Sequence, residues 1–436
     1  MKKVAFITLG CKVNQYETNA MAQEFLRKGY EVVEHTEFAD IYVINTCTVT
    51  NMSDRKSRQM LRRVKELNKD GIVVACGCYA QVAKSELEKI EEVDLLLGNN
   101  EKKDIVKYVE EYQKNRKKEL EVEDVMHKQE FVEFGSVVYT EKTRAVIKVQ
   151  DGCDRFCSYC IIPYARGRVR SRKPEAIVSE IKKIAEEGIK EVVITGIHIA
   201  SYGKDFKEDY KLIDLLEEIN KVDGIKRIRL GSLEPLLITK EFVERLTKLE
   251  KICHHFHLSL QSGCDETLKR MNRRYTTGEF REIVKLLRKK YEDVNLTTDI
   301  IVGFPKETEE EFNKTYEFLK EIKFYKMHVF KYSQRKGTKA AVMEGQIDGN
   351  KKEERSQRLI ELSNKNEREY NETYVGKEVE VLWEEGKDGI YKGHTKNYIL
   401  AHYKVDEGKE RIDNLENRIT KVKCIEAKQD HILVEV

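Results

Sequence analysis

Short apolar runs alternate with helical patterns along most of this chain, and this alternation constrains its fold more than any other feature. Near the N-terminus, buried strands are predicted at Val4–Leu9, Ile41–Asn45, Ile72–Ala75 and Val93–Leu97. Helices are predicted between them at Asn14–Lys28 and Thr50–Asn68. Strands and helices in this order are typical of a doubly wound parallel sheet. We therefore predict an α/β domain over residues 1–110.

A second strand and helix series begins after a charged, apolar-poor segment at residues 111–140, which we interpret as an exposed helix or linker. Its predicted strands are Ala145–Gln150, Glu191–Thr195, Lys226–Gly231, His255–Leu260, Asn295–Ile301 and Met327–Tyr332. Helices are predicted between them, for example at Pro174–Glu187, Thr277–Arg288 and Glu309–Ile322. Six strands are fewer than the eight of a closed TIM barrel, so residues 141–370 are predicted to form a partial (β/α)6 barrel.

The pattern changes again from Tyr374 onward, where short strands are separated by turns that contain glycine. This pattern is typical of a small all-β barrel. The polar helical stretch Gly345–Glu372 is predicted to connect it to the preceding domain. Residues 371–436 are thus predicted to be a third domain, which agrees with the usual domain size for a chain of 436 residues.

Three cysteines, Cys153, Cys157 and Cys160, lie just after the first strand of the second domain. At this spacing, three thiolates can bind three irons of a cubic 4Fe–4S cluster and leave the fourth iron open to a small molecule. Loops after parallel strands are also where β/α folds carry reactive groups. A zinc site or three packing cysteines are the alternatives. Zinc usually needs a fourth protein ligand, and neither His198 nor the histidines within residues 254–257 lie at zinc-finger spacing.

The segment from Cys153 to Cys160, with an aromatic residue before the last cysteine, closely resembles the hallmark of the radical S-adenosylmethionine (SAM) superfamily. The resemblance implies that SAM chelates the open iron through its amino and carboxylate groups. An electron from the cluster then cleaves SAM to methionine and a 5′-deoxyadenosyl radical. By the same resemblance, the residues expected to bind the cofactor are Tyr159, Thr195, Gly196, Ser232, Glu234 and Gln261.

A second group of cysteines is spread over the first domain. Cys11, Cys47 and Cys78 each follow a predicted strand. Because the carboxyl ends of parallel strands share one edge of a sheet, these three thiols can converge into a second site. The alternative is that they are buried structural cysteines, which are common in reducing compartments. Cys76 lies two residues before Cys78 and competes with it as a ligand.

The segments around these cysteines, Gly10–Asn14, Asn45–Cys47 and Gly77–Gln81, resemble the N-terminal motifs of the methylthiotransferases. The resemblance implies that Cys11, Cys47 and Cys78 hold an auxiliary 4Fe–4S cluster, and the family pattern selects Cys78 over Cys76. It extends over nearly the whole chain, and the last domain resembles the TRAM domain, a small RNA-binding β-barrel. Further matching segments are Ile161–Arg168, Met271–Tyr275 and Asp299–Pro305.

Within this family, Cys11–Glu17 and Asp54–Arg58 most resemble the branch that acts on N6-threonylcarbamoyladenosine in tRNA. This implies methylthiolation of carbon 2 of adenine beside the anticodon, an unactivated C–H position that requires a cofactor radical. One SAM would methylate a sulfur on the auxiliary cluster, and a second would supply the radical. A reductase or flavodoxin-like protein is the expected electron donor. The alternatives are methylthiolation of isopentenyladenosine or of a ribosomal-protein aspartate, and a non-catalytic RNA-binding metalloprotein.

RNA contacts must come from local basic clusters, because the net charge is only +3. The first candidate cluster lies just beyond the second cysteine motif and contains Arg166, Arg168, Arg170 and Arg172. Arg166 and Arg168 are alternatively predicted to bind the carboxylate of SAM. The second candidate is the strip Lys392, Lys396 and Tyr398, whose ring could stack on a base. However, the stretch from Asn371 to the end has 11 Lys and Arg against 14 Asp and Glu, which argues against a broad basic platform.

No run of the sequence approaches 18 apolar residues, so no membrane-spanning helix is predicted. Residues 1–11 imitate a lipoprotein signal, but the apolar run Val4–Leu9 is shorter than a secretory segment. We therefore expect a cytoplasmic protein, in which clustered cysteines indicate metal binding or catalysis before disulfides. Cys253, Cys264 and Cys424 have no motif partner and are interpreted as packing thiols.

Overall fold

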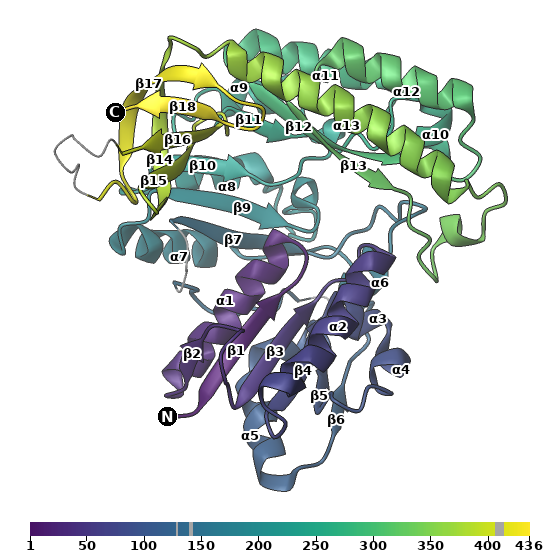
Figure 1. Cartoon of the computed structure of the whole chain (residues 1–436), viewed down its shortest axis with the longest axis vertical. Coiled ribbons are helices and arrows are strands. Elements are labelled where there is room, and N and C mark those ends of the chain that lie inside the picture. Colours follow the sequence, from purple (N-terminus) through teal and green to yellow (C-terminus); the bar gives the residue numbers. More distant parts are fainter. Residues whose placement is uncertain (128–129, 139–142, 406–413) are drawn as a thin grey trace.

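The computed structural model describes residues 1–127, 130–138, 143–405 and 414–436, which form three regions (Figure 1). The N-terminal α/β region lies at one end, and the larger strand and helix region lies beside it. The C-terminal β-barrel packs against this larger region. Three domains of the predicted types are therefore present. No helix of the described residues is both long and apolar enough to span a membrane.

The N-terminal region is a six-stranded parallel sheet in the order β2-β1-β3-β4-β5-β6. Its strands are β1 (Lys3–Thr8), β2 (Glu31–Val33), β3 (Ile41–Thr46), β4 (Ile72–Gly77), β5 (Leu95–Leu97) and β6 (Glu119–Glu121). Its helices are α1 (Lys12–Arg27), α2 (Asn51–Leu67), α3 (Cys78–Val82), α4 (Lys84–Leu87) and α5 (Ile105–Asn115). Phe25 of α1 and Val109 of α5 pack on one face of the sheet, and Leu61 of α2 packs on the other. The doubly wound prediction is confirmed.

The predicted linker over residues 111–140 is wrong in its first part. Residues 111–115 complete α5, and β6 pairs with β5 as the last strand of the sheet. Further along, Val125 and Val137 are buried. The sequence did not predict β6 because a three-residue edge strand with two glutamates has almost no apolar signal. The first domain thus extends beyond residue 110.

The central region has six parallel strands in chain order, which curve into the predicted partial barrel. They are β7 (Arg144–Asp151), β9 (Glu191–Gly196), β10 (Arg227–Leu230), β11 (His255–His257), β12 (Asn295–Val302) and β13 (Lys326–Lys331), and the short β8 (Arg170–Ser171) is antiparallel to β7. The helices are α6 (Ile162–Arg166), α7 (Pro174–Glu186), α8 (Leu212–Asn220), α9 (Lys240–Leu246), α10 (Asp265–Arg270), α11 (Thr277–Lys290), α12 (Glu309–Ile322) and α13 (Gly349–Glu372). Short 3-10 turns span Glu101–Asp104, Ile199–Ser201, Pro235–Leu237 and Lys339–Val342.

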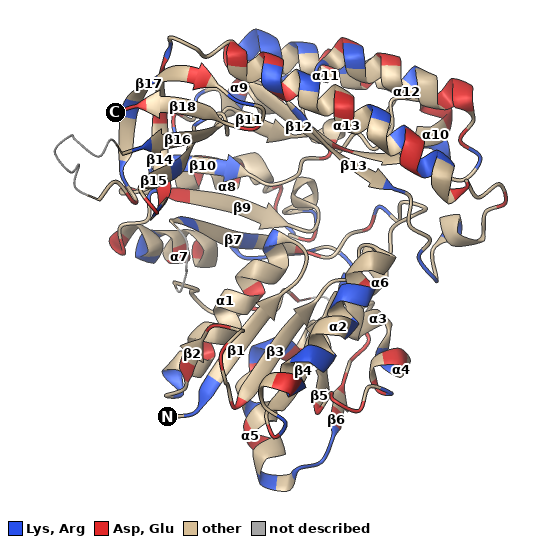
Figure 2. Cartoon of the chain, viewed as in Figure 1, with Lys and Arg blue, Asp and Glu red and all other residues tan. Residues whose placement is uncertain are grey.

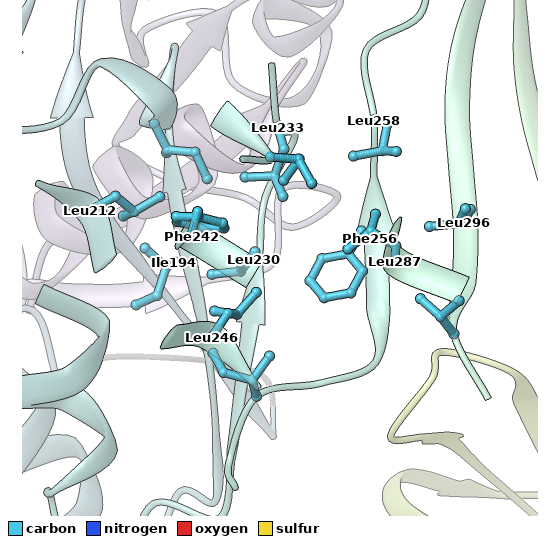
Figure 3. Close-up of a cluster of buried hydrophobic side chains, with 14 of the residues drawn as sticks. Ile194, Leu212, Leu230, Leu233, Phe242, Leu246, Phe256, Leu258, Leu287 and Leu296 are labelled. Carbon is cyan, nitrogen blue, oxygen red and sulfur yellow. The ribbon is translucent and has the colours of Figure 1, made fainter. Parts of the chain in front are cut away.

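One continuous apolar core lies between these strands and their helices. Figure 3 shows part of it, with Ile194 of β9 and Leu230 of β10 beside Phe242 and Leu246 of α9. Helix α13, predicted only as a connector, adds Leu359 to this core. The partial barrel therefore forms a rigid support for the loops at the carboxyl ends of its strands.

The C-terminal region is a closed barrel of five strands, as predicted, in the order β14-β15-β16-β18-β17. The strands are β14 (Glu378–Lys387), β15 (Ile390–Thr395), β16 (Leu400–Lys404), β17 (Ile419–Ala427) and β18 (Ile432–Glu435). Its core surrounds Trp383, which is fully buried. Arg227 of β10 joins the two barrels, because its guanidinium donates to the carbonyl oxygens of His394 (2.8 Å) and Glu380 (3.0 Å).

Candidate functional site

The structure brings Cys11, Cys47 and Cys78 together at one edge of the N-terminal sheet, as the sequence predicts. Cys11 follows β1, Cys47 follows β3 and Cys78 begins α3 directly after β4. These strands are parallel neighbours, so their carboxyl ends share an edge. After burial, the nearby Cys78 is the largest contribution that raises the pKa of Cys47, to about 11, and Cys11 adds to it. We call these three residues the N-terminal cysteine group.

Two glycines allow the backbone to approach this group closely. Gly10 has a φ of +101° and Gly77 a φ of +98°, which side chains rarely tolerate. A Cβ atom at Gly10 would lie 2.7 Å from the Cys47 sulfur, and one at Gly77 would lie 2.5 Å from the Thr46 carbonyl oxygen. The two turns therefore require glycine, and they place the cysteines of neighbouring strands side by side.

Cys76 is placed away from this group. It is fully buried in the core that also contains Met21 and Phe25. Burial raises the pKa of its thiol to about 12. Cys78, in contrast, accepts a hydrogen bond from the Arg166 Nε at 3.2 Å. Cys78 thus lies with the other two cysteines while Cys76 lies in the apolar core, and the choice of Cys78 as the ligand stays a prediction.

Arg166 connects the N-terminal cysteine group to a buried charge cluster between the first two domains. Its guanidinium donates to Asn14 Oδ1 (2.6 Å) and pairs with Glu17. Glu17 also pairs with Lys102 (2.5 Å) and Lys148 (2.7 Å). Burial acts to raise the pKa of the Glu17 carboxyl, but its three cationic partners hold that pKa well below the usual value. Positive charge is thus fixed beside the Cys78 sulfur.

The structure contradicts the predicted RNA role of Arg166, Arg170 and Arg172. Their exposed fractions are 0%, 0% and 1%, so they cannot reach an external phosphate. The reason is that this segment runs beneath the first domain, where each cation meets a polar partner. Arg172, for example, pairs with Glu133 (2.6 Å) and Glu180 (2.8 Å). Glu133 lies 39 residues before Arg172 and Glu180 lies on the following helix α7, so the arginine run alone gave no signal of burial.

Arg168 is the exception in this run, because its side chain is 52% exposed. It pairs with Asp154 at 3.3 Å, and its guanidinium lies 5.0 Å from the centre of the Phe156 ring. Exposed pairs of this kind contribute little to stability and are easily exchanged for a ligand. Arg168 therefore stays a candidate for RNA or SAM contact.

Cys153, Cys157 and Cys160 lie in the loop between β7 and α6, and we call them the loop cysteine group. All three are partly exposed. The Cys160 N–H donates to the Cys157 carbonyl oxygen (3.0 Å), which closes a tight turn. The loop must pass close to the neighbouring backbone, because a Cβ atom at Gly152 would lie 1.8 Å from the Arg168 carbonyl oxygen.

A second arginine contacts this group. Arg273 donates to the Cys157 sulfur (3.4 Å) and to Glu234 Oε2 (2.9 Å). Burial acts to raise the pKa of Glu234, but His198 and Arg273 outweigh it and lower that pKa. Arg273 lies in the family-like segment Met271–Tyr275, but nothing in the sequence distinguishes it from its neighbours. Neither arginine beside a cysteine could be identified without the fold.

The sulfurs of neither cysteine group are spaced for a single zinc ion. Tetrahedral zinc with ligands at about 2.3 Å would bring its sulfurs to roughly 3.8 Å from one another. In the described part of the chain, no three ligand atoms that include one of these cysteines lie within 4.8 Å of one another. The three thiolates of a cubic cluster are farther apart than those of a zinc site, so an iron–sulfur cluster stays the prediction for both groups.

The predicted SAM-binding residues lie on the rim around the loop cysteine group. Thr195 and Gly196 end β9, Ser232 and Glu234 follow β10, and Gln261 follows β11. The Tyr159 ring packs edge-on against Phe304, with 6.4 Å between ring centres. The rim is arranged as expected, although the Glu234 carboxylate is already bound by Arg273. Direct contact between these side chains and SAM stays a prediction.

A cavity of about 670 Å³ adjoins both cysteine-bearing domains and the C-terminal barrel. Its wall includes Cys11 and Lys12 from the first domain, several residues of the partial barrel, and Tyr398. The Tyr398 ring stacks against His255 and His394, with 4.8 and 4.5 Å between ring centres. The cavity thus combines one cysteine of the N-terminal group with an aromatic wall.

The other two predicted RNA contacts of the C-terminal barrel differ from each other. Lys392 is exposed, whereas the Lys396 ammonium donates to the Glu250 carbonyl oxygen at 2.6 Å and helps to dock the two barrels.

Figure 2 shows that basic and acidic residues alternate on helices α11, α12 and α13. The charges in this view do not form a broad basic platform.

Comparisons with known proteins agree with this geometry. Residues 147–319 match the model of the radical SAM superfamily, and residues 3–98 match uncharacterized protein family UPF0004. The threonylcarbamoyladenosine tRNA methylthiotransferase MtaB of Bacillus subtilis is 43% identical, over 98% of this chain and 94% of the relative. A tRNA-2-methylthio-N(6)-dimethylallyladenosine synthase of Clostridium beijerinckii is 35% identical, over 100% and 96%.

A solved structure supports the fold. The radical SAM methyltransferase TsrM of Kitasatospora setae has a TM-score of 0.58 to this chain at 15% identity. The match covers 78% of this chain and 77% of TsrM. At this identity the likeness shows the fold alone.

Proposed function

This chain belongs to the radical SAM methylthiotransferases, and we propose that it transfers a methylthio group to carbon 2 of N6-threonylcarbamoyladenosine beside the tRNA anticodon. It is a tRNA-modifying enzyme that uses SAM and two 4Fe–4S clusters. The higher identity to the MtaB relative than to the dimethylallyladenosine synthase supports this substrate. The observation that carries the proposal is the pair of three-cysteine groups, one of which reaches the cavity through Cys11.

The loop cysteine group would hold the cluster that binds SAM, and the N-terminal cysteine group would hold the auxiliary cluster. When bound, these cofactors supply the radical and the sulfur that an unactivated aromatic C–H position requires. Three thiolates of the chain would hold each cluster. Arg166 and Arg273 donate to Cys78 and Cys157 and so compensate their negative charge.

The remaining residues would bind and enclose the substrates. Tyr159, Thr195, Gly196, Ser232, Glu234 and Gln261 are the proposed SAM-binding set on the barrel rim. The Tyr398 ring offers a stacking surface in the cavity, and exposed Arg168 and Lys392 offer charge to RNA phosphates. We further propose that the C-terminal barrel is a TRAM domain, that the enzyme works in the cytoplasm and that a flavodoxin-like reductant supplies its electrons.

Nucleoside analysis tests the substrate. Deleting the gene should abolish 2-methylthio-N6-threonylcarbamoyladenosine and leave its unmethylthiolated precursor in tRNA. Loss of a methylthiolated isopentenyladenosine instead would contradict the proposal. Incubation of the reconstituted protein with SAM, dithionite and precursor tRNA, without oxygen, separates an enzyme from an RNA-binding scaffold. An enzyme forms 5′-deoxyadenosine and the methylthiolated nucleoside, whereas a scaffold forms neither.

A further inference from the structure

The charged groups that line the cavity are nearly all committed to partners. Arg229 pairs with Glu191 (2.7 Å), and Lys326 pairs with Glu367 (2.8 Å). Asp299 lies 3.2 Å from the His257 ring nitrogen. The other pairs are His394 with Glu384 at 2.7 Å and Asp430 with His431 at 2.8 Å. A charged ligand would therefore be recognised by the lining residues that have no such partner.

Lys12 is such a residue. It is exposed, and the structure gives its ammonium no hydrogen bond or ion pair with a described residue. It lines the cavity directly beside Cys11. Burial lowers the pKa of His255 and of His328, and the Lys12 charge lowers both further, so the ammonium lies within electrostatic reach of both rings. Lys12 thus lines the cavity as a cation without a paired anion among the described residues, whereas the acidic groups of the wall, Asp299 and Asp430, already have histidine partners.

Tyr398 also lines the cavity, with its ring stacked against His255 and His394. Tyr398 is held in the left-handed region (φ +73°), and the Arg229 guanidinium lies 4.5 Å from its ring centre. The volume of about 670 Å³ is within the range of pockets that enclose one small organic ligand. His328 is a second polar group here whose side chain has no hydrogen bond with a described residue.

We propose that Lys12 binds the carboxylate of the threonylcarbamoyl substituent, so that an amino-acid-bearing adenine is selected over one with an apolar substituent. This rests on the proposed function and adds the residue that reads its substrate. The carboxylate is the one full charge that the substituent adds to adenine, and a lysine is a suitable point-charge partner for it. The neighbouring position of Cys11 would keep the bound base close to the N-terminal cysteine group.

The test compares binding of three anticodon stem-loops to the anaerobic holoenzyme at one salt concentration, by fluorescence anisotropy. One carries N6-threonylcarbamoyladenosine, the second its threonyl methyl ester and the third unmodified adenosine. The wild type should bind the acid about tenfold more tightly than the ester, as expected for one charge-assisted hydrogen bond. Lys12→Gln should bind both equally, and Lys12→Arg should restore the preference.

Lys28→Gln is the matched control, because Lys28 is an exposed lysine directly after the other end of α1. It should keep the wild-type preference for the acid. Iron content of each variant verifies that Lys12→Gln still loads its clusters. Equal preference for the acid in Lys12→Gln and the wild type would overturn the inference. Failure of the wild type to methylthiolate threonylcarbamoyladenosine tRNA would instead overturn the proposed function.

Discussion

The two cysteine groups differ in where their arginine partner comes from. In the loop cysteine group, Arg273 donates to Cys157 from within the same partial barrel. In the N-terminal cysteine group, Arg166 donates to Cys78 from the neighbouring domain. The loop cysteine group is contained in eight consecutive residues, and its sequence alone indicates it. The N-terminal cysteine group is assembled from three strand ends and completed across a domain boundary. A local motif can therefore predict the ligands, but only the fold shows which charges surround them.

The largest expected effect separates the chemistry of the two groups. Cys157→Ala should abolish both SAM cleavage and product formation, because the open iron that binds SAM would be lost. Cys47→Ala should keep reductive cleavage of SAM to 5′-deoxyadenosine and lose only the methylthiolated nucleoside. Chromatography of both products from one anaerobic reaction measures this. Loss of 5′-deoxyadenosine in Cys47→Ala would show that the two groups are not independent.

The next effect tests whether the domain boundary supports the N-terminal cysteine group. Arg166→Gln should lower the free energy of unfolding by about 3 kcal/mol, because Glu17 and Asp151 lose a buried cationic partner. Arg168→Gln is the control, since it removes the same charge from an exposed pair and should cost less than about 0.5 kcal/mol. Urea unfolding of the cluster-free proteins measures both, and equal effects would refute a special role for the buried cluster.

A buried ion cluster outside both cysteine groups, centred on Glu191, gives a pH dependence. Burial acts to raise the pKa of Glu191, but Arg229, Arg144 and Arg227 lower it overall. A lowered pKa means that this stabilisation is full above the unfolded value of about 4.3 and is lost as the pH falls below it. Glu191→Gln should therefore cost about 2 kcal/mol at pH 7 and progressively less from about pH 5 to 3.

The same unfolding measurement over this pH range checks the prediction for Glu191. The control is Glu317→Gln, which removes a carboxylate from an exposed pair with Lys320 and should have little effect at any pH. If the loss of stability in Glu191→Gln grew as the pH fell, the pKa of Glu191 would be raised by folding instead of lowered. That result would contradict the assigned ion pairs.

The smallest effect concerns RNA. Arg168→Gln and Lys392→Gln should each weaken tRNA binding about threefold and reduce the salt dependence by about one counterion. Binding titrations at several salt concentrations give both values. Lys28→Gln should change neither, because Lys28 lies at the end of α1 remote from Cys11. Unchanged slopes in Arg168→Gln would remove the last arginine of the predicted RNA cluster.

Much of the fold follows from local sequence signals. The six central strands and helices α7, α11 and α12 lie within about two residues of their predictions at most boundaries, because buried strands and amphipathic helices leave strong patterns. The features that the sequence did not predict have weak local patterns or depend on contacts between distant parts of the chain. Edge strands β2 and β6 are three residues long. The arginines beyond the loop cysteine group resembled an RNA-binding run, because only the fold brings Glu17, Glu133 and Glu180 into contact with them.

We expect each three-cysteine group to hold its own cluster, and iron and sulfide analysis with Mössbauer spectroscopy on anaerobically reconstituted protein measures this. The wild type should contain two 4Fe–4S clusters. Cys47→Ala and Cys157→Ala should each keep about half of the iron, and the double variant should keep none. A wild type with a single cluster, or a single variant that retains both clusters, would contradict the account.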